Sequence, residues 1–408
     1  MEPKKSGFIK FSNSEKLMPQ EEMLEISKKK SNLTIGVPKE TSYQERRVAL
    51  VPSAVGVLVE NGHQVFIESE AGKAANFPDN EYSEEGGLIV YTPEEVFKAD
   101  IILKVAPPSI NEICSFKPKQ TIISALHLTA QNEIYFKNLI EKRITAISFE
   151  HIKDKSNSYP IMRSISEIVG TTSILIAAEY LSNSEFGRGK MLGGFSGIIP
   201  SEVVIVGAGN VAEFAAKAAI GFGAFVKIFD NSIYKLKSIQ NNLNARIYTS
   251  TIQPKVLQDA LKTADVVIGA LHAVNENSPI VVSEDMVRCM KSGAVIVDIS
   301  IDKGGCIETS SITNHIKPIF KKHGVTHYCV PNIGSRVPHT ASYALSNHFS
   351  TIILKVGEEG GVENMLKNNP GVRKGVYLHN GTVTNKYISD YYRLPYQDIE
   401  LLIATFHG

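Results

Sequence analysis

The chain has 408 residues, with 43 basic and 42 acidic side chains and a formal net charge of +1. This length suggests two domains. The balanced charge argues against a nucleic-acid partner, and we read no apolar run as long enough to span a membrane. The four cysteines have no metal-ligand spacing, so we expect reduced thiols, no metal site and a cytoplasmic location.

Residues 1–32 are predicted to form an N-terminal arm. The segment is polar, ends in Lys28-Lys29-Lys30, and contains no apolar signal-peptide core after its first residues. We expect either an appended helix or arm that packs on a neighbouring subunit, or a loosely ordered tail.

The next stretch alternates short apolar runs with helical patterns. Strands are predicted at residues 33–37, 64–67, 100–105, 121–125 and 145–149, and Pro52 opens a helix. This alternation indicates an α/β domain. A long helical pattern from about Ser164 to Leu181 follows and is expected to bridge two domains.

A glycine-rich turn between two strand patterns predicts a nucleotide site. The apolar run Val203–Val206 is followed by Gly207-Ala208-Gly209-Asn210-Val211-Ala212 and then by a helical pattern. Gly207 allows a sharp turn, and Gly209 lets a ligand approach the backbone. Ala212 replaces the third glycine of the dinucleotide fingerprint. The helix N-terminus would bind the pyrophosphate through its unpaired N–H groups and its dipole.

Asp230 ends the next apolar strand, residues 225–229, about twenty residues after the turn. A carboxylate there would accept hydrogen bonds from a ribose diol and repel a 2′-phosphate. The pattern therefore favours NAD over NADP. The alternative is an ordinary strand–helix turn without a nucleotide.

Later patterns complete the second unit and return to the first. Strands are predicted at 265–269, 294–299 and 327–330, a helix from 341 to about 358, and helix and loop from Gly371 onward. The expected fold is α/β, with two Rossmann-like domains that have parallel sheets. The nucleotide-binding domain, 165–339, is inserted into a substrate domain, 33–164 and 340–408. A substrate is expected in the cleft between them.

Several motifs in order from Leu33 onward carry a family resemblance: residues 36–41 (GVPKET), 47–49 (RVA), 103–105 (LKV), 126–128 (LHL), 166–167 (SE), 297–306 (VDISIDKGGC) and 328–332 (YCVPN). They resemble alanine dehydrogenase, in the superfamily that it shares with the NAD-binding subunit of proton-translocating transhydrogenase. The resemblance implies reversible NAD-dependent oxidative deamination of L-alanine to pyruvate and ammonium. It also implies a homohexamer.

Two basic residues are candidate substrate ligands. A guanidinium fixes a carboxylate bidentately, and the resemblance assigns this role to Arg47 rather than Arg46. Lys104 ends an apolar strand and is expected to face the cleft, where it would bind the carboxylate or polarise the pyruvate carbonyl. The alternatives are a surface ion pair for Arg47 and a snorkelling lysine at a strand end.

Proton transfer is expected from His127 and Asp302. An imidazole suits proton transfer near neutral pH, although a histidine in an apolar stretch can also be a core residue. Asp302 follows a predicted strand, at the end that faces the ligand crevice. Asp298 is its rival, because strand alternation allows both to face the same side. The Asp-x-Gly-Gly context and the resemblance favour Asp302, which is also placed on the cofactor side; a structural turn is the alternative.

The remaining candidates are cofactor contacts. The positions that match cofactor contacts of the family are Ser166, Asn210, Val211, Lys235 and Asn332. Two further residues, Ala270 and Leu271, are expected near the adenine or ribose. Ile299 and Ile333 are the last two cofactor candidates. Polar residues at strand ends are also common without a function.

Three other functions stay open. One is a soluble transhydrogenase module that binds NAD(H) and docks on a membrane partner, which would not need the set of Arg47, Lys104 and His127. A second is a non-catalytic NAD(H)-binding protein of the same fold. A third is a related dehydrogenase of the saccharopine-forming type, which would need a roomier cleft.

Overall fold

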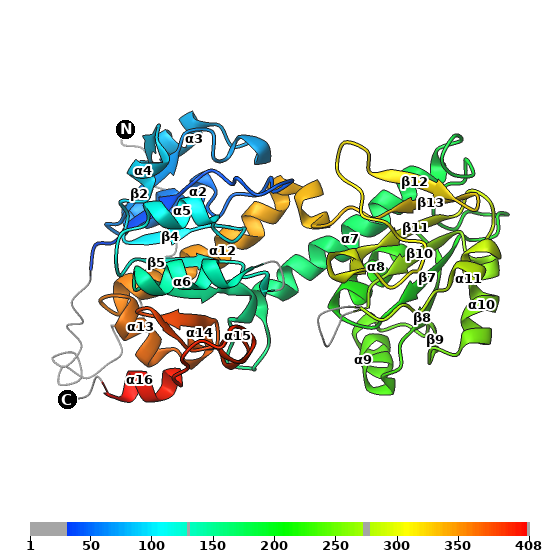
Figure 1. Ribbon diagram of the computed structural model, residues 1–408. Helices are drawn as coiled ribbons and strands as arrows, with labels where there is room; N and C mark the ends of the chain where they lie inside the picture. Colours follow the sequence, from blue (N-terminus) through cyan, green and yellow to red (C-terminus); the bar gives the residue numbers. More distant parts are fainter. Residues whose placement is uncertain (1–30, 129–130, 272–277, 406–408) are drawn as a thin grey trace, which may run out of the picture.

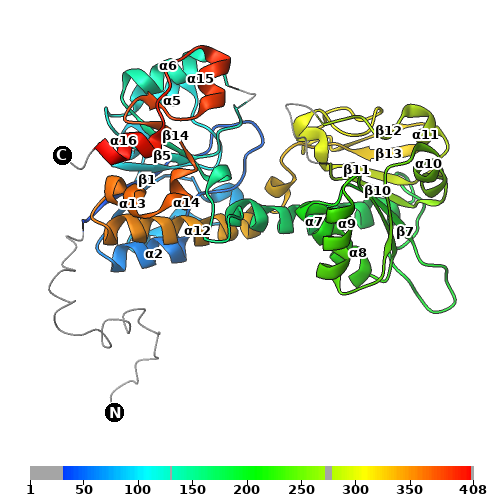
Figure 2. The same cartoon turned by 90° about the horizontal axis from the view of Figure 1, so that it is seen from below.

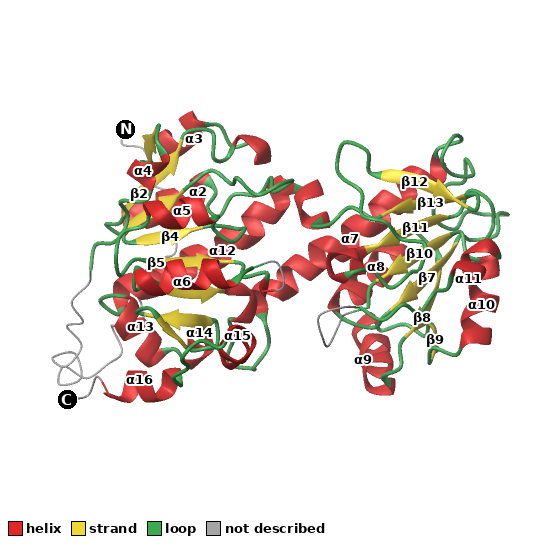
Figure 3. Cartoon of the chain, in the orientation of Figure 1, coloured by secondary structure: helices red, strands yellow, loops and turns green. Residues whose placement is uncertain are grey.

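The computed structural model describes residues 31–128, 131–271 and 278–405. Within these ranges the chain forms two α/β units, each built around its own mostly parallel sheet with helices on both faces (Figures 1 and 3). The predicted N-terminal arm lies almost entirely outside the described residues. The expected fold class, two Rossmann-like units with parallel sheets, is confirmed.

The first unit has an eight-stranded sheet in the order β15-β14-β6-β5-β4-β1-β2-β3. Strands β1 to β6 are parallel. Strands β2 and β3 follow on one side of β1 and strands β4 to β6 on the other, so the order of connection reverses between β1 and β4, as in a doubly wound fold. The strands are β1 (Thr34–Val37), β2 (Gln64–Glu68), β3 (Leu88–Val90), β4 (Ile101–Leu103), β5 (Thr121–Ser124), β6 (Thr145–Ser148), β14 (Val376–His379) and β15 (Thr382–Val383).

The helices of this unit come from both ends of the chain. They are α2 (Pro52–Glu60), α3 (Asp79–Glu84), α4 (Pro93–Val96), α5 (Ile110–Ser115), α6 (Glu133–Glu141), α13 (Val362–Asn368), α14 (Pro370–Arg373), α15 (Lys386–Tyr392) and α16 (Ile399–Thr405), with 3₁₀ turns η2 (Lys73–Ala75) and η4 (Phe149–His151).

The second unit has a seven-stranded sheet in the order β12-β13-β11-β10-β7-β8-β9. The order in which its parallel strands are connected reverses between β7 and β10, so both units have a switch point. The strands are β7 (Glu202–Val206), β8 (Phe225–Phe229), β9 (Tyr248–Ser250), β10 (Val266–Gly269), β11 (Val295–Asp298), β12 (Ile319–Lys322) and β13 (Val325–Tyr328). The helices are α8 (Asn210–Gly221), α9 (Ile233–Leu243), α10 (Pro254–Thr263) and α11 (Glu284–Arg288), with 3₁₀ turns η5 (Ile299–Lys303) and η6 (Ile333–Arg336).

Two long helices, α7 (Pro160–Ser182) and α12 (Pro338–Glu358), run between the units (Figure 2). They pack on each other, α7 also on α8 and α12 also on α2. The domain boundaries expected at 164/165 and 339/340 fall inside these two helices. By length and composition alone α7 would qualify as a membrane span, which the sequence reading missed. Its contacts with both units account for its apolar character.

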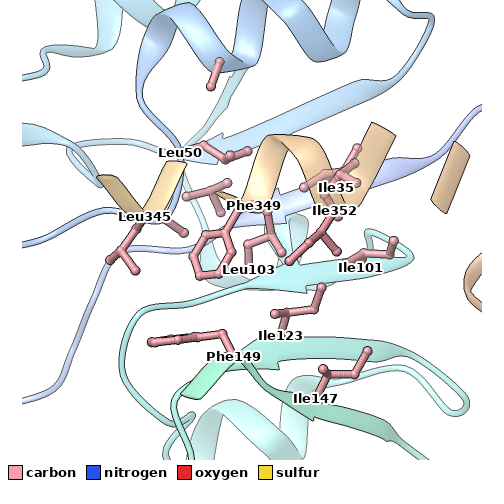
Figure 4. Packing of buried hydrophobic residues seen from close by; sticks show 14 of the residues in the cluster. Ile35, Leu50, Ile101, Leu103, Ile123, Ile147, Phe149, Leu345, Phe349 and Ile352 are labelled. Atoms are coloured by element: carbon pink, nitrogen blue, oxygen red, sulfur yellow. The ribbon is translucent and has the colours of Figure 1, made fainter. Parts of the chain in front are cut away.

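The hydrophobic core of the first unit includes residues of α12, which follows the second unit in the sequence. In Figure 4 Leu345, Phe349 and Ile352 of α12 lie against Leu103 and Ile123 of the sheet. Phe349 is fully buried, with its ring 5.4 Å from that of Phe149. Burying such side chains stabilises the fold by about 1.5–3 kcal/mol each. The later part of the chain is therefore part of this core.

The C-terminal tail differs from the expected helix and loop. Strand β14 pairs antiparallel with β6, and a hairpin turn at Asn380 and Gly381 leads to β15. Both turn residues have positive φ, 47° and 78°, as a type I′ turn requires. The Asn-Gly pair was the available signal, but strands of four and two residues give little periodicity.

Candidate active site

Most of the predicted site residues lie at the carboxyl ends of strands beside the two switch points. In the first unit Arg47 follows β1, Lys104 follows β4 and His127 follows β5. In the second unit the glycine turn follows β7 and Asp302 lies in η5, directly after β11. Ligands of open α/β sheets bind at this place. The two crevices are therefore the candidate places for a substrate and a nucleotide.

Arg47 is buried and paired with Glu45. Its Nε donates to one Glu45 oxygen at 2.7 Å and its Nη2 to the other at 2.6 Å. Burial opposes the charged form, but Glu45, and then Glu40 and Asp302, raise the pKa of Arg47 above its ordinary value. The guanidinium stays charged. A pocket of about 190 Å³ opens beside it, lined by Lys39, Glu40, Glu45, Arg46, Arg47, Glu70, Ala71, Lys73 and Ala74.

Lys104 differs from the expectation of a side chain that faces the cleft, because it is 1% exposed. Its Nζ lies 2.9 Å from Glu112 and 3.2 Å from Glu40. Burial would lower the pKa of Lys104, but these two carboxylates raise it. Burial also raises the pKa of Glu40, against the opposing effect of Lys104. One buried cation thus compensates two buried carboxylates.

His127 is exposed at the end of β5 and has a left-handed backbone, φ 43°. Few residues other than glycine adopt this region, and such residues cluster at functional sites. The Glu150 carboxylate accepts the backbone N–H of Leu126 at 2.7 Å and that of His127 at 3.4 Å. Glu150 therefore fixes the backbone that directs the imidazole outward. The alternative of a buried core histidine does not apply.

Asp302 and Asp298 have different environments. Asp298 is fully buried and accepts hydrogen bonds from Ser300, Cys306 and Ser310 at 2.7–3.2 Å. It therefore stabilises the turn after β11. The Asp302 side chain is accessible to solvent, and strand alternation does not govern it because it lies in η5.

The accessible carboxylate lies within electrostatic range of both predicted partners. Desolvation by the surrounding chain raises the pKa of Asp302, while the Asn332 N–H, His127, Arg47 and Lys303 oppose this rise. The N–H of Asn332 is 2.8 Å from Asp302 Oδ1. The fold thus brings Asp302 near residues of the other unit, and a raised pKa in a crevice is typical of acid–base groups.

The glycine turn has the geometry that a bound pyrophosphate needs. Gly207 has φ 116°, and a Cβ on it would lie 2.3 Å from the Ala270 carbonyl oxygen. No described atom lies within 4 Å of a Cβ built on Gly209, which forms the N-cap of α8. Gly207 is therefore required by the protein itself, whereas the space over Gly209 is open beside the free N–H groups of the helix.

Asp230 is buried and already bound to the glycine turn. Its Oδ2 accepts the Ala208 N–H at 2.8 Å and its Oδ1 accepts the Ser232 N–H at 2.7 Å. It therefore fixes the turn, and each oxygen keeps a lone pair for a ribose hydroxyl.

The remaining cofactor candidates lie on several elements of the second unit and on α7. Asn210 and Val211 begin α8, and Ala270 and Leu271 lie against Gly207. Ser166 donates to the Met162 carbonyl inside α7, and Lys235 is exposed on α9. Ile299 is partly buried, whereas the Ile333 side chain is buried in the core of the second unit.

Sequence reasoning missed the acidic residues around the basic ones. Glu40, Glu45 and Glu112 surround Lys104 and Arg47, and Glu150 fixes the backbone at His127. A signal existed for Glu112, since Ser109 and Glu112 have capping-box spacing and form that box at the start of α5. For the others the sequence holds no comparable signal, because their partners are set by the fold.

Comparison with known families identifies this arrangement. The model of the alanine dehydrogenase/PNT N-terminal domain matches residues 36–169, and that of the C-terminal domain matches residues 173–386. The chain belongs to the alanine dehydrogenase/PNT family. The two matches together span both units and both switch points, which confirms the resemblance drawn from the motifs.

Relatives of this family match over nearly their whole length. An alanine dehydrogenase of Methanococcus maripaludis is 39% identical over 90% of this chain and 99% of the relative; one of Staphylococcus saprophyticus is 37% identical with the same coverage. A solved L-alanine dehydrogenase superposes with a TM-score of 0.82 at 35% identity, covering 88% of this chain and 99% of that one. A transhydrogenase from Sinorhizobium meliloti, 22% identical with a TM-score of 0.74, shares the fold.

Proposed function

We propose that the chain is an NAD-dependent alanine dehydrogenase, which converts L-alanine, NAD and water reversibly to pyruvate, ammonium and NADH. One observation carries the proposal: a hydrogen-bonded chain through Glu45 and Asn332 joins Arg47 of the first unit to Asp302, which follows a strand of the nucleotide-type unit. A candidate carboxylate ligand and a candidate proton-transfer group are thus linked across the two units, and the electrostatic effect of His127 on Asp302 supports the same grouping. The small pocket beside Arg47 suits a substrate of the size of alanine.

Each residue of the site has a separate role in the proposed reaction. Arg47 binds the alanine carboxylate. The buried Lys104 compensates the charge of Glu40, which lines the same pocket as Arg47. The glycine turn at Gly207 and Gly209 and the carboxylate of Asp230 would hold the dinucleotide, whose nicotinamide would supply the acceptor for the hydride of the alanine Cα. His127 removes the proton from the amino group and, with Asp302, activates the water that adds to the imine. Fixing these groups on rigid strand ends reduces the entropic cost of reaching the reactive geometry.

The first test is NADH formation from L-alanine and NAD at alkaline pH, for the wild type and for His127→Ala. We expect alanine-dependent turnover in the wild type and a loss of about 10²–10⁴-fold in the variant, because a proton-transfer group is removed. NADH fluorescence should report unchanged binding. No wild-type turnover with intact NADH binding would favour a transhydrogenase-like or non-catalytic protein. Turnover that survives the mutation would remove His127 from the mechanism.

The cofactor is proposed to be NAD because a carboxylate occupies position 230. Asp230→Asn keeps one of the two acceptors that hold the backbone N–H groups of Ala208 and Ser232, and it removes the charge that repels a 2′-phosphate. We expect the ratio of kcat/KM for NADP to that for NAD to rise at least about tenfold. The ratio is measured with saturating alanine, and an unchanged ratio would contradict the role of Asp230.

By resemblance to the family we also propose a homohexamer located in the cytoplasm. Large apolar side chains with high exposure on one segment of the second unit would suit a subunit contact: Met191, Phe195, Ile198 and Ile199.

A further inference from the structure

Four side-chain hydrogen bonds from two separate parts of the chain end on the carboxylate of Glu45, which also accepts the backbone N–H groups of Arg46 and Arg47. Arg47 donates two of them. Asn332 Nδ2 donates a third at 2.9 Å, and Ser335 Oγ donates a fourth at 2.8 Å. Asn332 and Ser335 lie at η6, where the chain enters α12. Glu45 therefore contacts both the substrate arginine and the junction between the units.

The same Asn332 contacts Asp302 through its backbone. Its N–H lies 2.8 Å from Asp302 Oδ1, while its side-chain amide is directed to Glu45. The residue adopts the left-handed conformation, φ 55° and ψ 55°, in which asparagine is tolerated better than most residues. A continuous hydrogen-bonded chain thus joins Arg47, Glu45, Asn332 and Asp302.

The Glu45 carboxylate accepts these bonds as an anion. Burial would raise its pKa, but Arg47 and Ser335 lower the pKa of Glu45 to about 2. Glu45 occupies the Nε and Nη2 side of the guanidinium, which leaves the edge formed by Nη1 and the second Nη2 hydrogen for another carboxylate. The plane of that edge is therefore set by Glu45.

We propose that Glu45 is a positioning residue: it orients Arg47 toward the substrate carboxylate and, through Asn332, fixes Asp302 relative to it. This inference rests on the proposed alanine dehydrogenase activity. Glu45 would thereby hold a fixed separation between Arg47, which binds the substrate, and Asp302, which transfers its protons. A displacement of about 1 Å in such a pair costs on the order of 100-fold in rate.

The charges around Asp302 supply a readout that a purely structural role would leave unchanged. His127, Arg47 and Lys303 act electrostatically on Asp302, and Glu45 forms an ion pair with Arg47 at 2.6 Å. Glu45→Gln removes that neutralising charge, so the full positive potential of Arg47 acts on Asp302 and lowers its pKa. The acid limb of the pH profile of kcat/KM is therefore expected to move to lower pH.

The experiment compares the full-length wild type with Glu45→Gln and Ser335→Ala. For Glu45→Gln we expect kcat/KM for alanine to fall about 100-fold, the acid limb to shift down, and the dissociation constant for NADH to stay within about twofold. Ser335→Ala removes one donor to Glu45 and is expected to lower kcat/KM about tenfold with an unchanged melting temperature. Because it is a small change, it keeps the test valid if Glu45→Gln fails to fold.

Glu179→Gln is the matched control. It breaks the exposed pair between Glu179 and Arg336 of η6 without touching Glu45, and is expected to leave kcat/KM within about twofold. Wild-type kinetics and pH profile in Glu45→Gln would overturn the inference, as would an inactive, unfolded Glu45→Gln with a fully active Ser335→Ala. A wild type without alanine turnover would instead contradict the proposed function, and the inference with it.

Discussion

Replacement of Lys104 by methionine is expected to abolish turnover and to lower the free energy of unfolding by about 3–5 kcal/mol at neutral pH. Methionine fills a similar volume but leaves Glu40 and Glu112 facing each other without a cation. Lys104 is 1% exposed, so water cannot replace the lost charge. Urea titration followed by circular dichroism measures the effect.

The pH dependence of this loss has a defined sign. Burial already raises the pKa of Glu40, and removal of Lys104 raises it further. A carboxyl group whose pKa is higher in the folded state than in the unfolded state destabilises the fold above its unfolded pKa. The deficit therefore shrinks as the pH falls from 7 to about 5.

Lys137→Met is the control for this prediction. It breaks an exposed pair with Glu133 on α6 and should change the free energy of unfolding by less than about 1 kcal/mol. A deficit that grows on acidification, or a Lys104→Met protein as stable as the control, would show that the buried cluster is not compensated in the way described.

Replacement of Gly207 and of Gly209 by alanine is expected to affect the stability of the protein differently. Gly207→Ala places a Cβ 2.3 Å from the Ala270 carbonyl oxygen at a positive φ, so the free enzyme itself is strained. Such strain costs about 1–3 kcal/mol before the steric clash is added. Gly209→Ala meets no described atom, so its melting temperature should equal that of the wild type.

Binding of NADH separates the two variants further. Gly209→Ala should weaken NADH binding at least about tenfold, because its methyl group occupies the path of the pyrophosphate. Gly207→Ala should lose binding and melt earlier. Thermal melts and NADH fluorescence titrations decide the matter. Wild-type affinity in Gly209→Ala would mean that the dinucleotide does not lie across this turn.

Much of the fold was predictable from local patterns. The strands around the glycine turn and the helix that became α7 have strong apolar periodicity, and the sheet orders follow the doubly wound arrangement. The hairpin of β14 and β15 was missed, because strands this short are stabilised by pairing with β6 rather than by their own sequence. Insertion of one unit into the other was predicted, since helical patterns flank the nucleotide unit on both sides.

The residues of the candidate site were proposed individually from sequence motifs, but the electrostatic interactions between them could not be. Arg47 and Lys104 are recognisable from their motifs, whereas their pairing with Glu45, Glu40 and Glu112 depends on contacts across the sheet. The choice between Asp298 and Asp302 also required the structure. Strand alternation treats the two alike, and only the 3₁₀ turn η5 separates a buried carboxylate from an accessible one.

The position of β14 also affects how the chain is completed during synthesis. Strand β6 lies between β5 and β14, yet roughly 230 residues separate it from its second partner, a delay on the order of 10–50 s at the usual rate of translation. The nucleotide unit is contiguous and emerges from the ribosome after β6 but before β14. Until β14 emerges, β6 presents the unpaired backbone groups of an edge strand. The nascent first unit therefore stays open to wrong strand pairing until the nucleotide unit and α12 have been made.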